Sequence, residues 1–240
     1  MFNGANLQRD AAVDQHLNVV LQAGVDDVVH VYSAFCRAFG PQRLMMEVGL
    51  TDLFMLGAKR CIDTHGQNVL LEWYTQENTT GCDFAATVLY KKQVGGAMEL
   101  EDNIAQYHIF FQAKVAQRDR ADRPYADFLY ESSKTVDKQK FQNYQNILLY
   151  NWAQQHNGEA YYVIYASDGV YWVNAAHLKT FFLNAVPKPE PGRAAWSNVE
   201  LCVMAWQALA KKSFLDARHS SYNPKPTYYS IGTADIRAKL

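Results

Sequence analysis

The run from His108 to Ala116 (HIFFQAKVA) constrains the fold of this chain more than any other stretch. Side chains of a β-strand point alternately to its two faces. The alternate positions from Ile109 to Val115 are hydrophobic or small, so they form one face, and Gln112 and Lys114 share the other. Hydrophobic flanks on both sides favour a central strand, where polar side chains are costly unless they are partnered or functional.

Other strands and helices follow from the spacing of apolar residues. A strand over residues 80–90 places Asp83 near its start, close to Gly81. Further strands are predicted over residues 68–75, 160–166 and 170–173. Helices are predicted over residues 11–23, 26–39, 51–63, with Thr51 as N-cap, 137–155 and 197–212. This order predicts an α/β fold with a mixed central sheet flanked by helices on both faces.

Composition breaks divide the chain into three segments. Residues 1–40 form an N-terminal helical extension, residues 41–186 the core, and residues 187–240, after a proline-rich break, a C-terminal helix and tail. A net charge of −1 over 240 residues argues against a protein that coats DNA. We find no signal peptide, no apolar stretch near the roughly 20 residues of a membrane span and no paired cysteines. We therefore expect a cytoplasmic protein without a membrane.

The polar residues on and near these strands suit phosphodiester hydrolysis, in which bound magnesium stabilises the phosphate charge. Asp83 is the first expected metal ligand, followed by the amide oxygen of Gln112 and the backbone carbonyl of Ala113. Lys114 would act as a point charge beside the phosphate or the attacking water. Glu47, on an upstream helical segment, is the best further carboxylate.

Each of these residues also has an ordinary structural interpretation. Gln112 and Lys114 fit the solvated face of an edge strand, and Asp83 fits turn chemistry beside a glycine. Glu47 alone is typical of a surface helix acid, and Gln145 of a polar helix position. The pattern is more specific taken together than residue by residue.

The residues Glu47, Gly81-Cys82-Asp83 and Gln112-Ala113-Lys114 resemble the motif of the restriction-endonuclease-like PD-(D/E)xK nucleases, in the Gln-x-Lys variant. More closely, the chain is similar to an uncharacterised bacterial, defence-associated family of such domains. That likeness rests on Leu50-Thr-Asp52, on Gln145 with Leu149 and Ala153, and on the aromatic run 161–165. The resemblance covers about residues 40–175 and implies the αβββαβ core of the superfamily. In one departure, no proline precedes Asp83.

The resemblance implies a Mg²⁺-dependent endonuclease that cleaves DNA, with Mn²⁺ as a possible substitute. Asp83, Gln112 and Ala113 would hold the metal, Lys114 would be the catalytic lysine, Glu47 would complete the site and Gln145 could reach it. Such domains serve as effectors or components of bacterial anti-phage defence or restriction systems, with possible partner proteins. RNA stays open as a substrate.

Two other classes of function compete with this hypothesis. One is a catalytically inactive nuclease-fold module that binds nucleic acid or a partner, and the other is an assembly protein that uses its aromatic surface. For the nuclease, we expect Arg118, Arg120 and Arg123 to form a substrate-binding rim, tempered by nearby aspartates. Because one such rim is weak, a homodimer or higher homo-oligomer is the expected active form.

Overall fold

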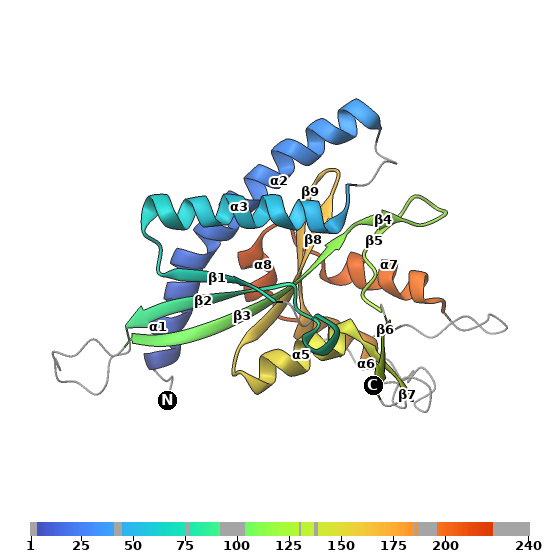
Figure 1. Ribbon diagram of the computed structural model, residues 1–240. Helices are drawn as coiled ribbons and strands as arrows, with labels where there is room; N and C mark the ends of the chain where they lie inside the picture. The colour runs from blue at the N-terminus through green and yellow to red at the C-terminus, as the bar shows by residue number, and fades with distance from the viewer. Residues whose placement is uncertain are drawn as a thin grey trace.

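A five-stranded mixed sheet organises the computed structural model (Figure 1), which describes residues 4–40, 45–74, 77–91, 104–129, 131–136, 139–184, 186 and 196–222. Its strands, in spatial order, are β1 (Val69–Trp73), β2 (Phe84–Lys91), β3 (Ile104–Val115), β8 (Glu159–Ala166) and β9 (Gly169–Asn174). Strands β3 and β8 pair in parallel, and the other neighbours pair antiparallel. The predicted α/β class is confirmed.

Helices cover both faces of the sheet. One face packs against the N-terminal helices and a short C-terminal helix: α1 (Gly4–Ala12), the π-helix η1 (Val13–Leu17), α2 (Asn18–Phe39), α3 (Glu47–His65) and α8 (Phe214–His219). The other packs against α5 (Gln145–Gln155), α6 (Ala175–Asn184) and α7 (Asn198–Leu209). The elements α3, β1, β2, β3, α5 and β8 follow one another in the predicted order, with short elements inserted: α4 (Glu77–Thr80) and two hairpins.

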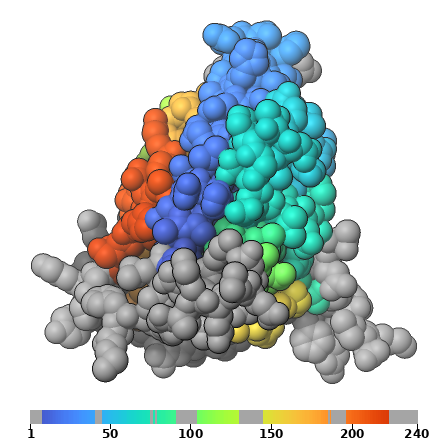
Figure 2. All heavy atoms as spheres, turned by 90° about the vertical axis from the view of Figure 1, so that its left-hand side faces the viewer, coloured from blue at the N-terminus to red at the C-terminus, as the bar shows by residue number. Residues whose placement is uncertain are grey.

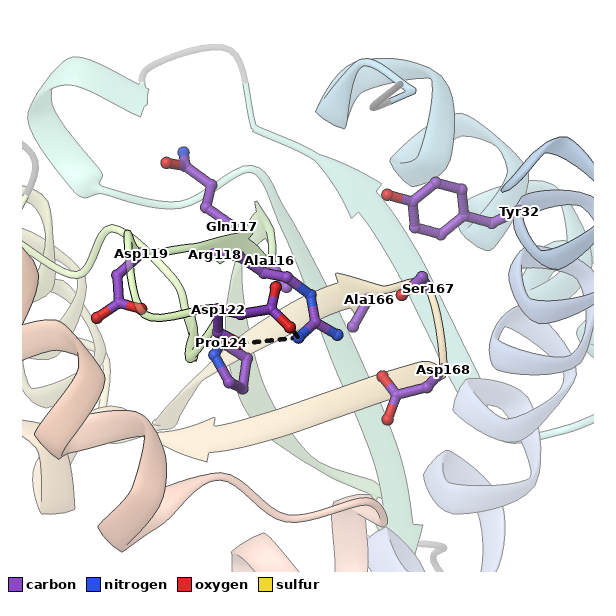
Figure 3. Close-up of a pocket in the computed structure, with 10 residues that line it drawn as sticks. All are labelled: Tyr32, Ala116, Gln117, Arg118, Asp119, Asp122, Pro124, Ala166, Ser167 and Asp168. Carbon is purple, nitrogen blue, oxygen red and sulfur yellow. Dashed lines mark hydrogen bonds and ion pairs between the residues drawn. The ribbon is translucent and has the colours of Figure 1, made fainter. Parts of the chain in front are cut away.

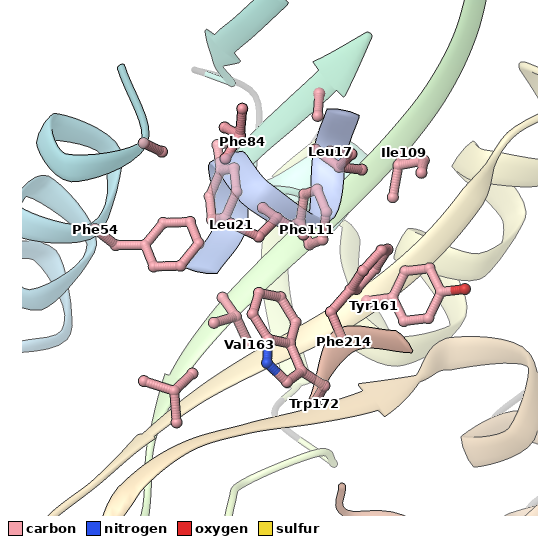
Figure 4. Close-up of a cluster of buried hydrophobic side chains, with 14 of the residues drawn as sticks. Leu17, Leu21, Phe54, Phe84, Ile109, Phe111, Tyr161, Val163, Trp172 and Phe214 are labelled. Carbon is pink, nitrogen blue, oxygen red and sulfur yellow. The ribbon is translucent and has the colours of Figure 1, made fainter. Parts of the chain in front are cut away.

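The core on the first face is built from stacked aromatic rings (Figure 4). Phe111 of β3 stacks on Phe84 with ring centroids 4.8 Å apart, and Trp172 and Phe214 pack edge-on against one another. Leu17 joins the same cluster from the N-terminal helices. All three segments of the sequence therefore contribute to one core, and Figure 2 shows the N-terminal helices running between α3 and α8.

The buried Arg218 connects α8 and the first helices to the sheet. The Arg218 side chain on α8 is only 5% exposed and pairs with Asp10 at 2.8 Å, Asp14 at 2.5 Å and Glu159 at 3.2 Å. Its partners come from the first helices and from the start of β8. Removing one member of such a group leaves a buried charge unpaired, so this network fixes how the ends dock.

The N-terminal helices are longer and more apolar than expected. Residues 4–39 are helical throughout, where two separate helices were predicted. By length and composition, Gln8–Phe39 is apolar enough to cross a membrane, contrary to the expectation that no segment is. Its residues Leu17, Leu21 and Val28 are buried in the core, while 28% of its apolar 18-residue window as a whole is buried.

Two predicted element boundaries near the site are wrong. Helix α3 begins at Glu47, and Thr51 is no N-cap: it lies inside the helix, where its hydroxyl donates to the Glu47 carbonyl. Strand β2 begins at Phe84: Thr80 ends α4, and residues 81–83 form a turn in which Gly81 has a φ of +65° that a strand does not allow.

The predicted helix over residues 137–155 is wrong in its first half. Residues 131–136 (β6) and 139–144 (β7) pair as an antiparallel hairpin, and α5 begins at Gln145. The β-branched pair Thr135-Val136 favours a strand there. Pairing of the two strands therefore prevails over the helical spacing of the apolar residues in this segment. The predicted common face of Gln145, Leu149 and Ala153 is correct, and all three residues are buried.

Gly81 lets the turn before β2 lie directly against α5. A Cβ atom added at Gly81 would lie 2.6 Å from the Gln145 carbonyl oxygen, whereas one added at Gly66, whose φ is +60°, would meet nothing within 4 Å. Both substitutions to alanine share the left-handed backbone cost of about 1–2 kcal/mol. We expect Gly81→Ala to lower the free energy of unfolding by a further ~1–3 kcal/mol of overpacking, measured by urea denaturation. Equal losses in the two variants would contradict this packing.

Candidate active site

Just before β2 begins at Phe84, the carboxylate of Asp83 takes the place of strand backbone beside β3. The Asp83 backbone N–H still donates to the Phe111 carbonyl at 2.9 Å. Beyond that point its Oδ2 accepts the Ala113 backbone N–H, and also the Gln112 side-chain Nε2, each at 2.6 Å. The side chain thus takes a hydrogen bond that a longer β2 would have taken, which fixes Asp83 against β3.

Gln112 is fully buried and only half satisfied. Its Nε2 donates to Asp83 Oδ2 and to the Ala113 carbonyl, but its Oε1 has no hydrogen-bond partner among the described residues. A buried polar atom without a partner costs about 1–3 kcal/mol. The amide oxygen, the Ala113 carbonyl and the Asp83 carboxylate are the oxygen ligands that Mg²⁺ prefers. The donor set therefore fits a divalent cation.

Lys114 lies on the same strand face and reaches the start of α3. Its Nζ is 3.6 Å from Glu47 Oε1, and the side chain is 11% exposed. Burial raises the pKa of Glu47, while Lys114 and the Val115 backbone N–H partly offset that effect. The structure therefore brings Glu47 to Lys114, as the sequence predicted for one common site.

The site carries more negative than positive charge. Burial raises the pKa of Asp83 from 3.8 to about 7 against the opposing Ala113 hydrogen bond, and the charge of Glu77 raises it further. Lys114 lowers the pKa of Asp83, and Glu47 raises it. Three carboxyl groups thus influence one another around one lysine.

Glu77 was missed by the sequence analysis. It lies in the first turn of α4, in the connection between β1 and β2, and its Oε1 accepts a hydrogen bond from Gln145 Nε2. Gln145 itself is 1% exposed and reaches the site through Glu77. The signal in the sequence that could have identified Glu77 is an acid six positions before Asp83 in the same connection. The short helix that places it there, α4, was not predicted.

The expected arginine rim is a hairpin that leaves the sheet directly after β3. Strands β4 (Gln117–Arg118) and β5 (Pro124–Tyr125) form it, and its ion pairs are internal: Arg118 with Asp122 at 3.3 Å and Arg123 with Asp119 at 2.6 Å. Arg120 is exposed.

Hollows lie on both sides of this hairpin. One of about 450 Å³ lies between Arg118 and Asp122 of the hairpin, Tyr32 of α2 and Asp168 of the β8–β9 turn (Figure 3). Another, of about 640 Å³, lies between Arg120 and the start of α7.

Comparisons with known proteins add no assignment. No known family model matches the chain, and no curated protein is significantly similar to it. Within the described residues, no group of three or more His, Cys, Asp and Glu side chains is close enough to hold a metal ion. Two of the three ligand oxygens described above come instead from an amide and a backbone carbonyl, those of Gln112 and Ala113.

The raised pKa of Asp83 predicts a particular pH dependence of stability. Below the unfolded value of 3.8 the carboxyl is protonated in both states; between that value and about 7 only the folded state holds the proton. Folding stability therefore falls as pH rises through this window and levels off above it. Because Glu47 titrates too, we expect the signature in the difference between wild type and Asp83→Asn, measured by urea unfolding without metal. A difference that does not change between pH 4 and 7 would contradict it.

Proposed function

We propose that this protein is a metal-dependent nuclease of the restriction-endonuclease-like PD-(D/E)xK superfamily that hydrolyses phosphodiester bonds of DNA. The observation that carries the proposal is the buried Gln112 Oε1, which has no partner among the described residues, beside the Asp83 carboxylate and with Lys114 on the same face of the same strand. The oxygens of Asp83, Gln112 and Ala113 would hold Mg²⁺ or Mn²⁺. The bound cation supplies Lewis-acid stabilisation of phosphate charge and a more acidic water.

The protein's own groups have distinct roles in this proposal. Lys114 places a positive charge where the phosphate gains negative charge during hydrolysis. Glu47 holds the ammonium of Lys114 in place through their ion pair at 3.6 Å. Asp83 fixes the position of Gln112 through their hydrogen bond. A cellular role in anti-phage defence or restriction, in the cytoplasm and with a possible partner protein, belongs to the same proposal.

Lys114 gives the sharpest test of catalysis. We expect Lys114→Ala to reduce plasmid cleavage in Mg²⁺ by about 10²-fold or more, because it removes a charge aimed at the transition state. Lys59→Ala is the matched control: Lys59 is an exposed lysine of α3 that pairs with Asp63, and this variant should cut normally. Circular dichroism checks the fold and EDTA the metal requirement. Undiminished cutting by folded Lys114→Ala would refute the assignment, and an inert wild type that still binds DNA would favour the inactive binding module.

The β4–β5 hairpin gives a test of the DNA path. Because Arg118 and Arg123 are already paired with aspartates, Arg120 is the cation most open to phosphate. We expect Arg120→Ser to weaken DNA binding and flatten the dependence of log K on log salt by about 0.9, one phosphate contact. Replacing all three arginines should have a larger effect. Arg60→Ser on α3, an exposed arginine paired with Asp27, is the control. An unchanged slope in the triple variant would place the DNA elsewhere.

The homodimer also stays part of the proposal. A single hairpin with three arginines and two aspartates offers little net charge to a polyanion. Two copies would present two hairpins and could cut both strands of a duplex. Mass measurement by light scattering, with and without DNA, reads the assembly directly.

A further inference from the structure

The short arm between β1 and β2 carries a second carboxylate toward the Asp83 site. The Tyr74 N–H donates to the Asp83 carbonyl at 2.9 Å, which closes the arm, and the Gly81 N–H donates to the Glu77 carbonyl at 2.7 Å, at the end of α4. Gly81 also packs directly on α5. Glu77 is therefore held at a fixed place relative to Asp83.

Packing on α5 connects Glu77 to the turn that carries Asp83. Gly81, two residues before Asp83, lies directly against the Gln145 carbonyl of α5, and the Gln145 side chain donates to Glu77 Oε1. The negative charge of Glu77 also raises the pKa of Asp83 and of Glu47. A cation bound by these carboxylates would relieve their repulsion.

Buried amide oxygens point to the same ligand. Gln145, 1% exposed, uses its Nε2 to hold Glu77, while its Oε1 has no partner among the described residues. Gln112 has the same pattern toward Asp83: Nε2 is bonded and Oε1 is buried without a partner. Asp83 and Glu77 thus each accept a hydrogen bond from one glutamine side chain. The amide oxygen of each glutamine has no partner among the described residues, and this lowers the stability of the fold. A bound cation or its water shell would remove that cost.

Glu47 is engaged differently. Its carboxylate faces Lys114, 3.6 Å away, and accepts a hydrogen bond from the Val115 backbone N–H. A carboxylate committed to an ammonium and a backbone donor is a poorer metal ligand than one held only by a neutral amide.

We propose that Glu77, rather than Glu47, is the second carboxylate ligand of the divalent cation, and that Gln145 is the positioning residue that holds it. The cation would then be bound by Asp83, Glu77, the Gln112 amide oxygen and the Ala113 carbonyl. This inference rests on the proposed function, and it gives the missed acid and the buried glutamine of α5 a joint role in metal binding.

Calorimetric titration of the full chain with Mn²⁺ alone, without DNA, tests the assignment. Loss of a residue that only supports a metal ligand costs about 10- to 100-fold in affinity, so loss of a direct ligand should cost at least about 10-fold. We expect Glu77→Gln to weaken Mn²⁺ binding by that amount and Glu77→Asp to weaken it less. Gln145→Leu should weaken it about 10-fold at an unchanged melting temperature. The matched control Glu72→Gln changes an exposed acid of β1 and should bind as wild type does.

The comparison with Glu47→Gln decides between the two acids. A change below about 3-fold in that variant upholds the inference, since it is smaller than the loss of a supporting residue. Wild-type affinity in Glu77→Gln, a larger loss in Glu47→Gln, or no Mn²⁺ binding by wild type would overturn it. The readout is separable from cleavage: wild type that binds Mn²⁺ through Glu77 but leaves plasmid intact upholds this inference while refuting the nuclease. If Glu77→Gln cuts plasmid normally and binds Mn²⁺ as wild type does, this inference is refuted and the nuclease proposal stands.

Discussion

The bond from the Ala113 N–H to the Asp83 carboxylate determines the rest of the site. Strand β2 begins at Phe84, so β3 runs on past it without a strand neighbour on that side. Asp83 accepts the backbone donor left there, at 2.6 Å, and thereby brings a carboxylate to the strand face that bears Gln112. A longer β2 would cover this point with backbone, and no ligand oxygens could gather there.

This arrangement has an electrostatic cost that a bound cation would remove. The negative charges of Glu77 and Glu47 raise the pKa of Asp83, while the positive charge of Lys114 lowers it. Protonation is the alternative route to relief, which is why the pKa of Asp83 rises to about 7. Beside Asp83 and Glu77, the buried oxygens of Gln112 and Gln145 add acceptors that have no hydrogen-bond partner among the described residues. A site specialised for stability alone would place neither excess acid nor unpaired acceptors here.

The sequence predicted what depends on local periodicity. Alternation along β3 correctly placed Gln112 and Lys114 on the face opposite Ile109, Phe111 and Ala113, which pack in the core beneath the N-terminal helices. Helical spacing correctly put Gln145, Leu149 and Ala153 on one face.

The failures lie where long-range contacts decide. The β6–β7 hairpin replaced a predicted helix, and α6, the contact partner of α5 and α7, was not predicted at all. Glu77 gained its place through Gly81 packing on α5 and through Gln145, contacts that no local pattern encodes.

The N-terminal helices and α8 support the site from the far side of the sheet. The ring of Phe111 on β3 contacts the ring of Phe214 on α8, with centroids 6.3 Å apart, and Leu17 packs in the same cluster. Arg218 then locks α8 to Asp10 and Asp14 of the N-terminal helices. Phe111 lies next to Gln112, and its carbonyl accepts the Asp83 N–H. A change in the packing of these helices against Phe111 would therefore shift the positions of Gln112 and Asp83. The helices over residues 4–39 and α8 therefore belong to the same packed unit as the site, although the sequence motif lies wholly between them.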